Sequence, residues 1–243
     1  MLQIQEPILV AQGIKKGFRL PGGDTFWALR GIDLSVPSGK LTILRGKSGS
    51  GKTTLMNIMS ALDDPTEGSV ELRLPDREPI RMESLTEKER AALRRKTIGF
   101  VFQSVALIPI MTARENVELA LRLGGWTENR EKRAKECLEL VGLGARMDHM
   151  PSEMSGGEQQ RVAIARAIAH SPQVVFADEP TGELDTNTAI SVVRLFKELN
   201  ADLGITIVMT THDRGFMEIG DAVYELEGGE LIGERAGSAH DRV

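Results

Sequence analysis

A glycine-rich segment of eight residues has the composition needed to hold phosphate groups. It consists of Gly46, Lys47, Ser48, Gly49, Ser50, Gly51, Lys52 and Thr53, which is the P-loop pattern of two glycines flanking four residues, followed by Lys-Thr. Glycine permits backbone conformations that a Cβ atom forbids, so that successive N–H groups can turn toward phosphate oxygens at a helix N-terminus. Lys52 then meets the β and γ phosphates, and Thr53 can bind Mg²⁺. The segment predicts binding of a nucleotide with Mg²⁺, and by itself it does not separate kinases, GTPases and transport ATPases, which share this phosphate cradle.

An acidic pair follows an apolar stretch later in the chain. Residues 174–177 read Val-Val-Phe-Ala and lead directly into Asp178 and Glu179. A carboxylate at the end of a strand, such as Asp178, can hold Mg²⁺, usually through water. Glu179 is placed to orient, and accept a proton from, the water that attacks the γ phosphate. Together with the P-loop, this pair predicts hydrolysis of the γ phosphate of the bound nucleotide.

A second phosphate-seeking segment lies between these two. After Met154 come Ser155, Gly156, Gly157 and Glu158, and an apolar pattern with helical spacing follows them. A Ser-Gly-Gly turn at a helix start is an anion site. Two such sites in one chain make sense if two copies face each other and each completes the site of the other.

The elements that must position these residues alternate between strands and helices, which predicts an α/β fold with a mostly parallel sheet covered by helices on both faces. An antiparallel entry sheet is expected first, with a turn at 20–24. Residues 104–158 lack a strand signal and are expected to form an inserted helical lobe, leaving 1–103 and 159–243 as the core of a single domain, 1–243. The strands of the entry sheet are expected at 8–11 and 32–36, and further strands at 40–45, 98–102, 173–177 and 205–210. Helices are expected at 53–62, from the Thr86/Glu89 capping box to 95, and around 190–203. A hairpin is expected at 222–232, and a frayed end at 233–243.

Composition narrows the classes of partner. The 243 residues carry a formal net charge of -5, which offers no general basic field for nucleic acid. The basic residues at 90 and 94–96 lie beside Glu87 and Glu89 and are expected to form a solvated helix face. The single cysteine, Cys137, has helical spacing to other apolar residues and is expected in the core. Because one cysteine cannot form a disulfide within the chain, the protein is expected in a reducing cytoplasm. The sequence shows neither a signal-peptide pattern nor an apolar stretch of 18 residues, so membrane association is expected through a partner.

This motif set resembles the nucleotide-binding domain of ABC transporters over nearly the whole chain, with residues 155–158 as the signature motif. The resemblance implies that Thr54 joins residues 46–53 in binding ATP and that Phe18, where the family often has Tyr, stacks on adenine. It implies that Gln103 touches Mg²⁺ and the attacking water, and that His212 contacts the γ phosphate and helps position Glu179.

The resemblance also implies that Asp185 arranges the dimer interface. Glu183, where a small residue or Asn is usual, either alters coupling between the two sites or points to solvent. His149, His170 and His240 match no motif of the family and are expected to be structural.

The resemblance further implies an ATP-hydrolysing subunit that forms a homodimer on binding ATP and powers an integral membrane permease. It would lie on the cytoplasmic side of the membrane and dock the permease near 103–115. Residues 98–103, 109–117 and 155–166 look most like the group that serves lipoprotein release, macrolide and peptide efflux, and antimicrobial-peptide resistance. The alternative is an FtsE-like regulatory or force-transmitting ATPase that moves no solute. A DNA-repair clamp would need long coiled-coil arms between the two nucleotide motifs, and residues 104–158 are too short to form them. A small-molecule kinase has no use for a second phosphate-seeking helix start at residues 155–157.

Overall fold

The computed structural model describes residues 6–236, and the chain divides into two compact units. One unit contains Met1–Arg90 and Thr206–Val243, and the other contains Ala91–Ile205. No helix in the described part of the chain is both long and apolar enough to cross a membrane. Of the expected frayed end at 233–243, residues 233–236 belong to a strand, and 237–243, with His240, lie outside the described residues.

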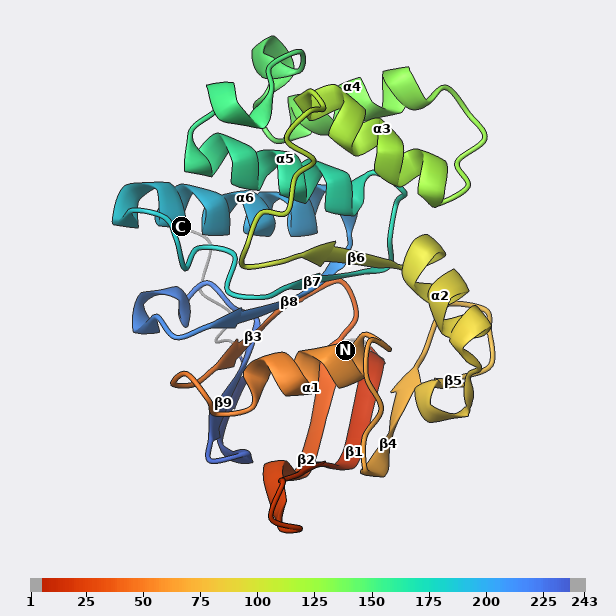
Figure 1. Cartoon of the computed structure of the whole chain (residues 1–243), viewed down its shortest axis with the longest axis vertical. Helices are drawn as coiled ribbons and strands as arrows, with labels where there is room; N and C mark the ends of the chain where they lie inside the picture. The colour runs from red at the N-terminus through yellow and green to blue at the C-terminus, as the bar shows by residue number, and fades with distance from the viewer. Residues whose placement is uncertain (1–5, 237–243) are drawn as a thin grey trace, which may run out of the picture. The chain divides into compact units, whose positions relative to one another are not determined.

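The first unit opens with an antiparallel sheet in the order β2-β1-β4-β5 (Figure 1). It is built from β1 (Pro7–Arg19), β2 (Thr25–Pro37), β4 (Glu67–Leu72) and β5 (Ile80–Arg81). The expected entry sheet and its turn are confirmed: the Leu20 amide donates to the Asp24 carbonyl at 2.8 Å. The first two strands run further than predicted. The prediction did not include β4 or β5, although buried Val70 and Leu72 alternate with polar neighbours as a half-buried strand requires.

The same unit contains a second set of strands in the order β10-β9-β3-β8. Here β3 (Leu41–Arg45) runs parallel to β8 (Thr206–Thr211) and to β9 (Ala222–Glu227), and every residue of β8 is buried. The predicted hairpin is confirmed, since β9 turns at Gly228-Gly229 into antiparallel β10 (Glu230–Ala236). Helix α1 (Lys52–Met59) begins where the P-loop ends, and the short helices η1 (Met82–Ser84) and η4 (Arg214–Phe216) complete the unit.

Helix α2 (Glu87–Lys96) corrects the expectation for the basic cluster. Its start is the predicted capping box, because the Thr86 amide donates to the Glu89 carboxylate at 2.8 Å. Arg90, however, does not belong to a solvated face. Its side chain is only 10% exposed, forms an ion pair with Asp64 and donates to the Leu85 carbonyl. The spacing of charges along the helix did not reveal Asp64, which comes from a distant part of the chain.

The second unit pairs β6 (Ile98–Val101) in parallel with β7 (Val174–Ala177). Helix α5 (Gly156–Ile168) lies between α6 (Thr186–Leu203) on one side and α3 (Ala113–Leu123) with α4 (Arg130–Leu140) on the other (Figure 1). The short helices η2 (Gly144–Arg146) and η3 (Pro151–Glu153) lead into α5. Residues 104–158 are therefore helical, as expected. Their separation as a lobe stays a prediction, because they share this compact unit with β6, β7 and α6.

Cys137 lies in the core of this helical part, as predicted. It is fully buried, and so are Ala134, Leu138 and Val141, the residues that share its side of α4 and its C-terminal end. Burial raises the pKa of its thiol to about 11. A thiol with so high a pKa carries little thiolate at neutral pH, so the structure supports a packing role.

Candidate nucleotide-binding and hydrolysis site

The P-loop follows β3 and closes tightly on its surroundings. Gly49 and Gly51 have φ values of +78° and +104°, which side-chain-bearing residues rarely adopt. A Cβ atom on Gly46 would lie 2.4 Å from the Leu226 carbonyl oxygen, and one on Gly51 would lie 2.8 Å from that of Ala28. The glycines at these positions are therefore required by backbone conformation and by close approach of neighbouring strands.

Lys52 places its ammonium group inside the curve of the loop. The residue is 4% exposed, and its Nζ donates to the carbonyl oxygens of Gly46 at 2.8 Å and Lys47 at 3.1 Å. The Oγ of Ser50 is buried and has no hydrogen-bond partner among the described residues. The first turn of α1 carries no acidic residue. A cation, an unpaired hydroxyl and a helix N-terminus free of carboxylates fit the phosphate groups of ATP.

His212 leaves its strand at the same edge as the P-loop. The strands β3 and β8 are parallel, with Arg45 opposite Thr211, and the Gly46 amide donates to the Thr211 carbonyl at 3.3 Å. His212, the next residue, is exposed. The structure thus brings the start of the phosphate-binding loop and the predicted γ-phosphate contact to adjacent strand ends.

Phe18 lies near the end of β1 and is 44% exposed. Its ring has the Lys16 Nζ 5.5 Å from its centroid, and its cross-strand partner is Phe26. An exposed aromatic ring beside a cation is suited to stacking on a nucleobase. Its role toward adenine remains a prediction.

The acidic pair ends β7 in the second unit. The Asp178 amide donates to the Val101 carbonyl at 2.8 Å, which continues the β6–β7 ladder. Glu179 has a φ of +41°, unusual for a residue with a side chain, and the Gly182 amide donates to its carbonyl at 3.0 Å. This strained turn fixes where the Glu179 backbone leaves the strand, as is common for residues held at functional sites.

Gln103 lies against this turn. It follows β6, whose Val101 is paired with Ala177, so Gln103 and Asp178 leave parallel strands at one edge. A Cβ atom built on Gly182 would lie 3.4 Å from the Gln103 Nε2. Within this unit the structure therefore brings Gln103 to the turn that carries Glu179, as the predicted shared role requires. No group of three or more His, Cys, Asp or Glu residues in 6–236 could hold a metal ion, and the Mg²⁺ ligands predicted here, a hydroxyl, an amide and one carboxylate, do not need such a group.

The signature segment begins α5 with a complete capping box. The Ser155 Oγ accepts from the Glu158 amide at 3.3 Å, and the Glu158 carboxylate accepts from the Ser155 amide at 2.8 Å. The bond from the Ser155 amide lowers the pKa of Glu158. Asp185 caps α6 in a similar way, accepting from the Thr188 amide, and the hydroxyl of Thr188 lowers its pKa. Glu183 is exposed in the single chain.

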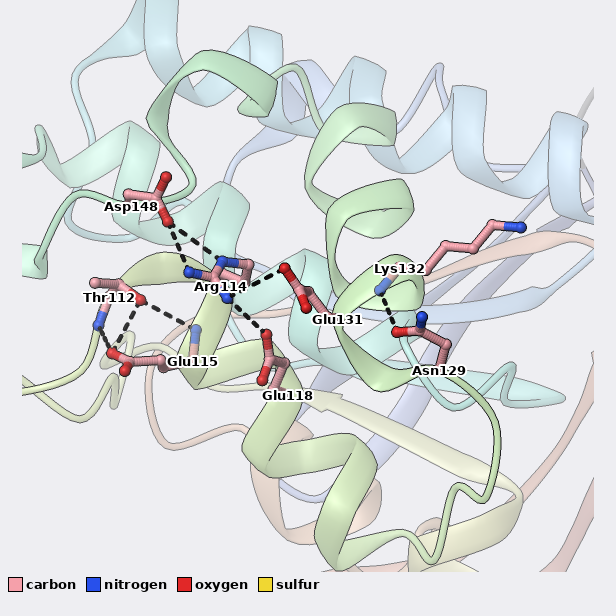
Figure 2. Close-up of polar contacts among 8 residues, drawn as sticks. All are labelled: Thr112, Arg114, Glu115, Glu118, Asn129, Glu131, Lys132 and Asp148. Carbon is pink, nitrogen blue, oxygen red and sulfur yellow. Dashed lines mark hydrogen bonds and ion pairs between the residues drawn. The ribbon is translucent and has the colours of Figure 1, made fainter.

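A cluster around Arg114 was not anticipated from the sequence, although Thr112 and Glu115 have capping-box spacing. Figure 2 shows that the Arg114 guanidinium lies between the carboxylates of Asp148, at 3.0 Å, and Glu118, at 3.2 Å. These bonds raise the pKa of Arg114. The Arg114 amide also donates to the Met147 carbonyl at 2.9 Å. The start of α3 is thereby fixed to the segment that precedes the signature helix.

The comparisons with known proteins agree with this geometry. Residues 29–182, more than half of the chain, match the family model described as ABC transporter. An uncharacterized ABC transporter ATP-binding protein of Methanocaldococcus jannaschii, MJ1508, is 46% identical over 84% of this chain and 89% of that protein. The macrolide export ATP-binding/permease protein MacB of Syntrophobacter fumaroxidans is 45% identical over 92% of this chain, which spans only 32% of MacB.

Solved structures give the same result. The dimeric post-hydrolysis state of the ATP-binding cassette MJ0796, bound to ADP and Pi, has a TM-score of 0.83 at 39% identity, covering 94% of this chain and 98% of that one. The structure of CbiO1 from Clostridium perfringens, part of an ABC transporter complex, has a TM-score of 0.81 at 27% identity and covers 95% of this chain and 89% of that one. The predicted P-loop NTPase fold and ATPase activity are thus confirmed. The chain belongs to the ABC transporter family and is one of its ATP-binding, ATP-hydrolysing cassettes.

Proposed function

We propose that two copies of this chain bind two ATP molecules, each held between the P-loop of one copy and Ser155–Glu158 of the other. The observation that carries this proposal is the second helix N-terminus at Ser155, which the P-loop of the same chain does not need. Its capping box leaves the first-turn amides of Gly156 and Gly157 for a phosphate. The solved cassette at 39% identity is itself a dimer. Closure on ATP and reopening after hydrolysis would form the working cycle.

We propose the following roles for the individual residues, as the resemblance to the family implies them. Residues 46–54 bind the phosphates, and Phe18 stacks on the adenine. Mg²⁺, held by Thr53, Asp178 and Gln103, would neutralise charge that develops on the transferred phosphoryl group. Glu179 orients the attacking water and accepts its proton, while His212 contacts the γ phosphate. Asp185 lies at the dimer interface.

We further propose that the dimer drives an integral membrane permease and is bound to the cytoplasmic side of the membrane through it. The docking surface would include residues 103–115 and the neighbouring hollow of about 270 Å³ lined by Met111, Glu115, Glu118, Leu119, Arg122 and Arg130. Ile110 directly precedes Met111 in the sequence, is 81% exposed and offers an apolar contact. The relative MacB is a macrolide export ATP-binding/permease protein, and this likeness favours efflux, lipoprotein release or peptide resistance over a regulatory ATPase.

Glu179→Gln tests the dimer and the catalytic role together, because Gln keeps the size of the side chain but cannot accept a proton. We expect loss of Mg-ATP turnover by at least about 100-fold, with an ATP-bound dimer that persists in size-exclusion chromatography. Lys52→Ala is the matched control and should lose both turnover and dimer. A Glu179→Gln monomer that still hydrolyses ATP would contradict the proposal.

Coupling to transport needs a separate test. We expect the chain to co-purify with a permease and its ATPase rate to rise when the permease binds its solute. An ATPase rate that responds to a bound partner but to no solute would instead support the regulatory alternative.

A further inference from the structure

Arg166, near the C-terminal end of α5, reaches a segment far away in the sequence. Its Nη1 donates to the carbonyl oxygen of Ala106 at 2.6 Å, and its Nη2 donates to that of Val105 at 3.1 Å. Both carbonyls belong to the stretch that directly follows Gln103. Residues 105–108 form neither helix nor strand, so this stretch has no ladder of its own to hold it. One guanidinium therefore joins the signature helix to the beginning of this stretch.

The local chemistry shows that this contact is specific. Among the described residues no carboxylate forms an ion pair with Arg166, and burial lowers its pKa. A partly buried charge without a counter-ion is costly, and here only backbone carbonyls compensate it. Ala106 also has a φ of +48°, a conformation that an alanine adopts only when its surroundings hold it there.

The other end of the stretch is held by a different helix. Asn116 of α3 is buried, accepts from the Ile108 amide at 2.8 Å and donates to the Ile108 carbonyl at 3.2 Å. Residues 105–108 are thus held by hydrogen bonds to α5 at one end and to α3 at the other. At their N-terminal side, Gln103 lies against the Glu179–Gly182 turn.

We propose that Arg166 is a positioning residue: by fixing Val105 and Ala106 to α5, it keeps Gln103 in place at the Glu179–Gly182 turn. It also links any displacement of residues 104–108 to the helix that begins at Ser155. The inference rests on the proposed roles of Gln103 and of the 103–115 surface. It adds a connection, inside one subunit, between the partner-facing stretch and the signature segment.

Hydrogen exchange of the full chain tests the contact independently of catalysis. We expect Arg166→Gln to speed exchange of the amides at 104–108 by about tenfold, because two charge-assisted bonds to this stretch are lost. Arg133→Gln is the matched control. Arg133 donates to the carbonyls of Ala169 at 2.9 Å and Ile168 at 3.4 Å at the end of the same helix, and does not touch residues 104–108. It should leave their exchange unchanged.

Steady-state kinetics then tests the positioning role. Arg166→Gln should lower kcat about tenfold and change KM for ATP less than about twofold, because the residue acts through Gln103 and not on the nucleotide. Combining it with Gln103→Ala should lower kcat no further than the stronger single change. Arg166→Lys keeps the charge, so its kcat should lie between those of the wild type and Arg166→Gln. If Arg166→Gln folds poorly, the Lys variant replaces it in this test.

Three results would overturn the inference. These are unchanged exchange at 104–108, an equal loss of kcat in Arg133→Gln, or additive effects of the Arg166 and Gln103 changes. The exchange result depends neither on the dimer nor on a permease, because it reports the contact within one chain. It can therefore be told apart from failure of the proposed function, which the Glu179→Gln experiment decides and on which the two kinetic results also depend.

Discussion

At the scale of single residues, two adjacent glycines of the signature segment have different reasons to be glycine. A Cβ atom on Gly157 would lie 2.4 Å from the Thr188 Cγ2, whereas one on Gly156 would lie 3.6 Å from the Leu184 Cδ2, an ordinary contact. Thr188 cannot move easily, because it is branched at Cβ and its amide and hydroxyl bond to Asp185. Packing within the chain therefore excludes a side chain at 157, while at 156 only a ligand or a second subunit would.

This difference predicts opposite effects of alanine at the two positions. Gly157→Ala should lower the free energy of unfolding by about 1–3 kcal/mol, because overpacking displaces Thr188 and weakens the cap of α6. Gly156→Ala should be neutral or stabilising by up to about 1 kcal/mol, since Ala favours helix. Urea unfolding of both variants measures the values, and equal destabilisation would contradict the packing argument.

At the scale of elements, Arg90 attaches the first turn of α2 to a distant part of the chain. Asp64, which follows α1, and Arg90 form an ion pair in which the arginine is largely buried and the carboxylate is 57% exposed. The hydrogen bond between Arg90 and Asp64 lowers the pKa of Asp64 and raises the pKa of Arg90. The helix itself is strongly polar, so its attachment depends on a few contacts of this kind.

Asp64→Asn should destabilise the protein by about 1 kcal/mol, a value reduced from that of a buried pair because Asp64 is solvated. Glu67→Gln is the control, since the Lys15–Glu67 pair is exposed on both sides and should contribute about 0.5 kcal/mol or less. The folded pKa of Asp64 lies below its unfolded value of about 3.9, so the stabilisation is present above that pH and is lost as the pH falls through the folded pKa. Thermal unfolding at pH 7 and at pH 3 measures both effects, and a Glu67→Gln loss as large as that of Asp64→Asn would count against the Arg90 anchor.

At the scale of the whole molecule, the net charge of -5 opposes the binding of an anion such as ATP. Attraction must therefore come from local groups, the buried Lys52 ammonium and the amides of the P-loop, which act at short range. Because these groups form a site only when the strands and α1 are in place, ATP binds the folded chain and stabilises all of it.

We expect ATP at about 100 times its Kd to add about 2.7 kcal/mol to the free energy of unfolding. Lys52→Ala should lose most of this gain, because the phosphates lose their buried cation. Lys40→Ala changes an exposed lysine directly before β3 and outside the loop; it is the matched control and should keep the gain. Differential scanning calorimetry with and without ATP supplies the measurement, and an ATP effect that survives Lys52→Ala would place the nucleotide elsewhere.

The sequence by itself determined the features that depend on neighbours along the chain. The P-loop, the capping box at Thr86, the helix start at Ser155, the hairpin turn at 228–229 and the core position of Cys137 all follow from local spacing, since turns, caps and helical faces are set within a few residues. The motif set also resembled that of the ABC transporter family, to which the comparisons show that the chain belongs. The short alternating strand β4 was missed because a few polar and apolar residues give a weak signal.

Only the tertiary structure decided which distant residues meet. The burial of Arg90 depends on Asp64, and the exclusion of a side chain at Gly157 depends on Thr188. The hydrogen bonds from Arg166 to Val105 and Ala106 span 61 and 60 positions of the chain. Such contacts arise when strands and helices pack, and no periodicity in the sequence records them. Local spacing predicted the chemical groups of this ATPase, and packing determined the contacts that hold them in place.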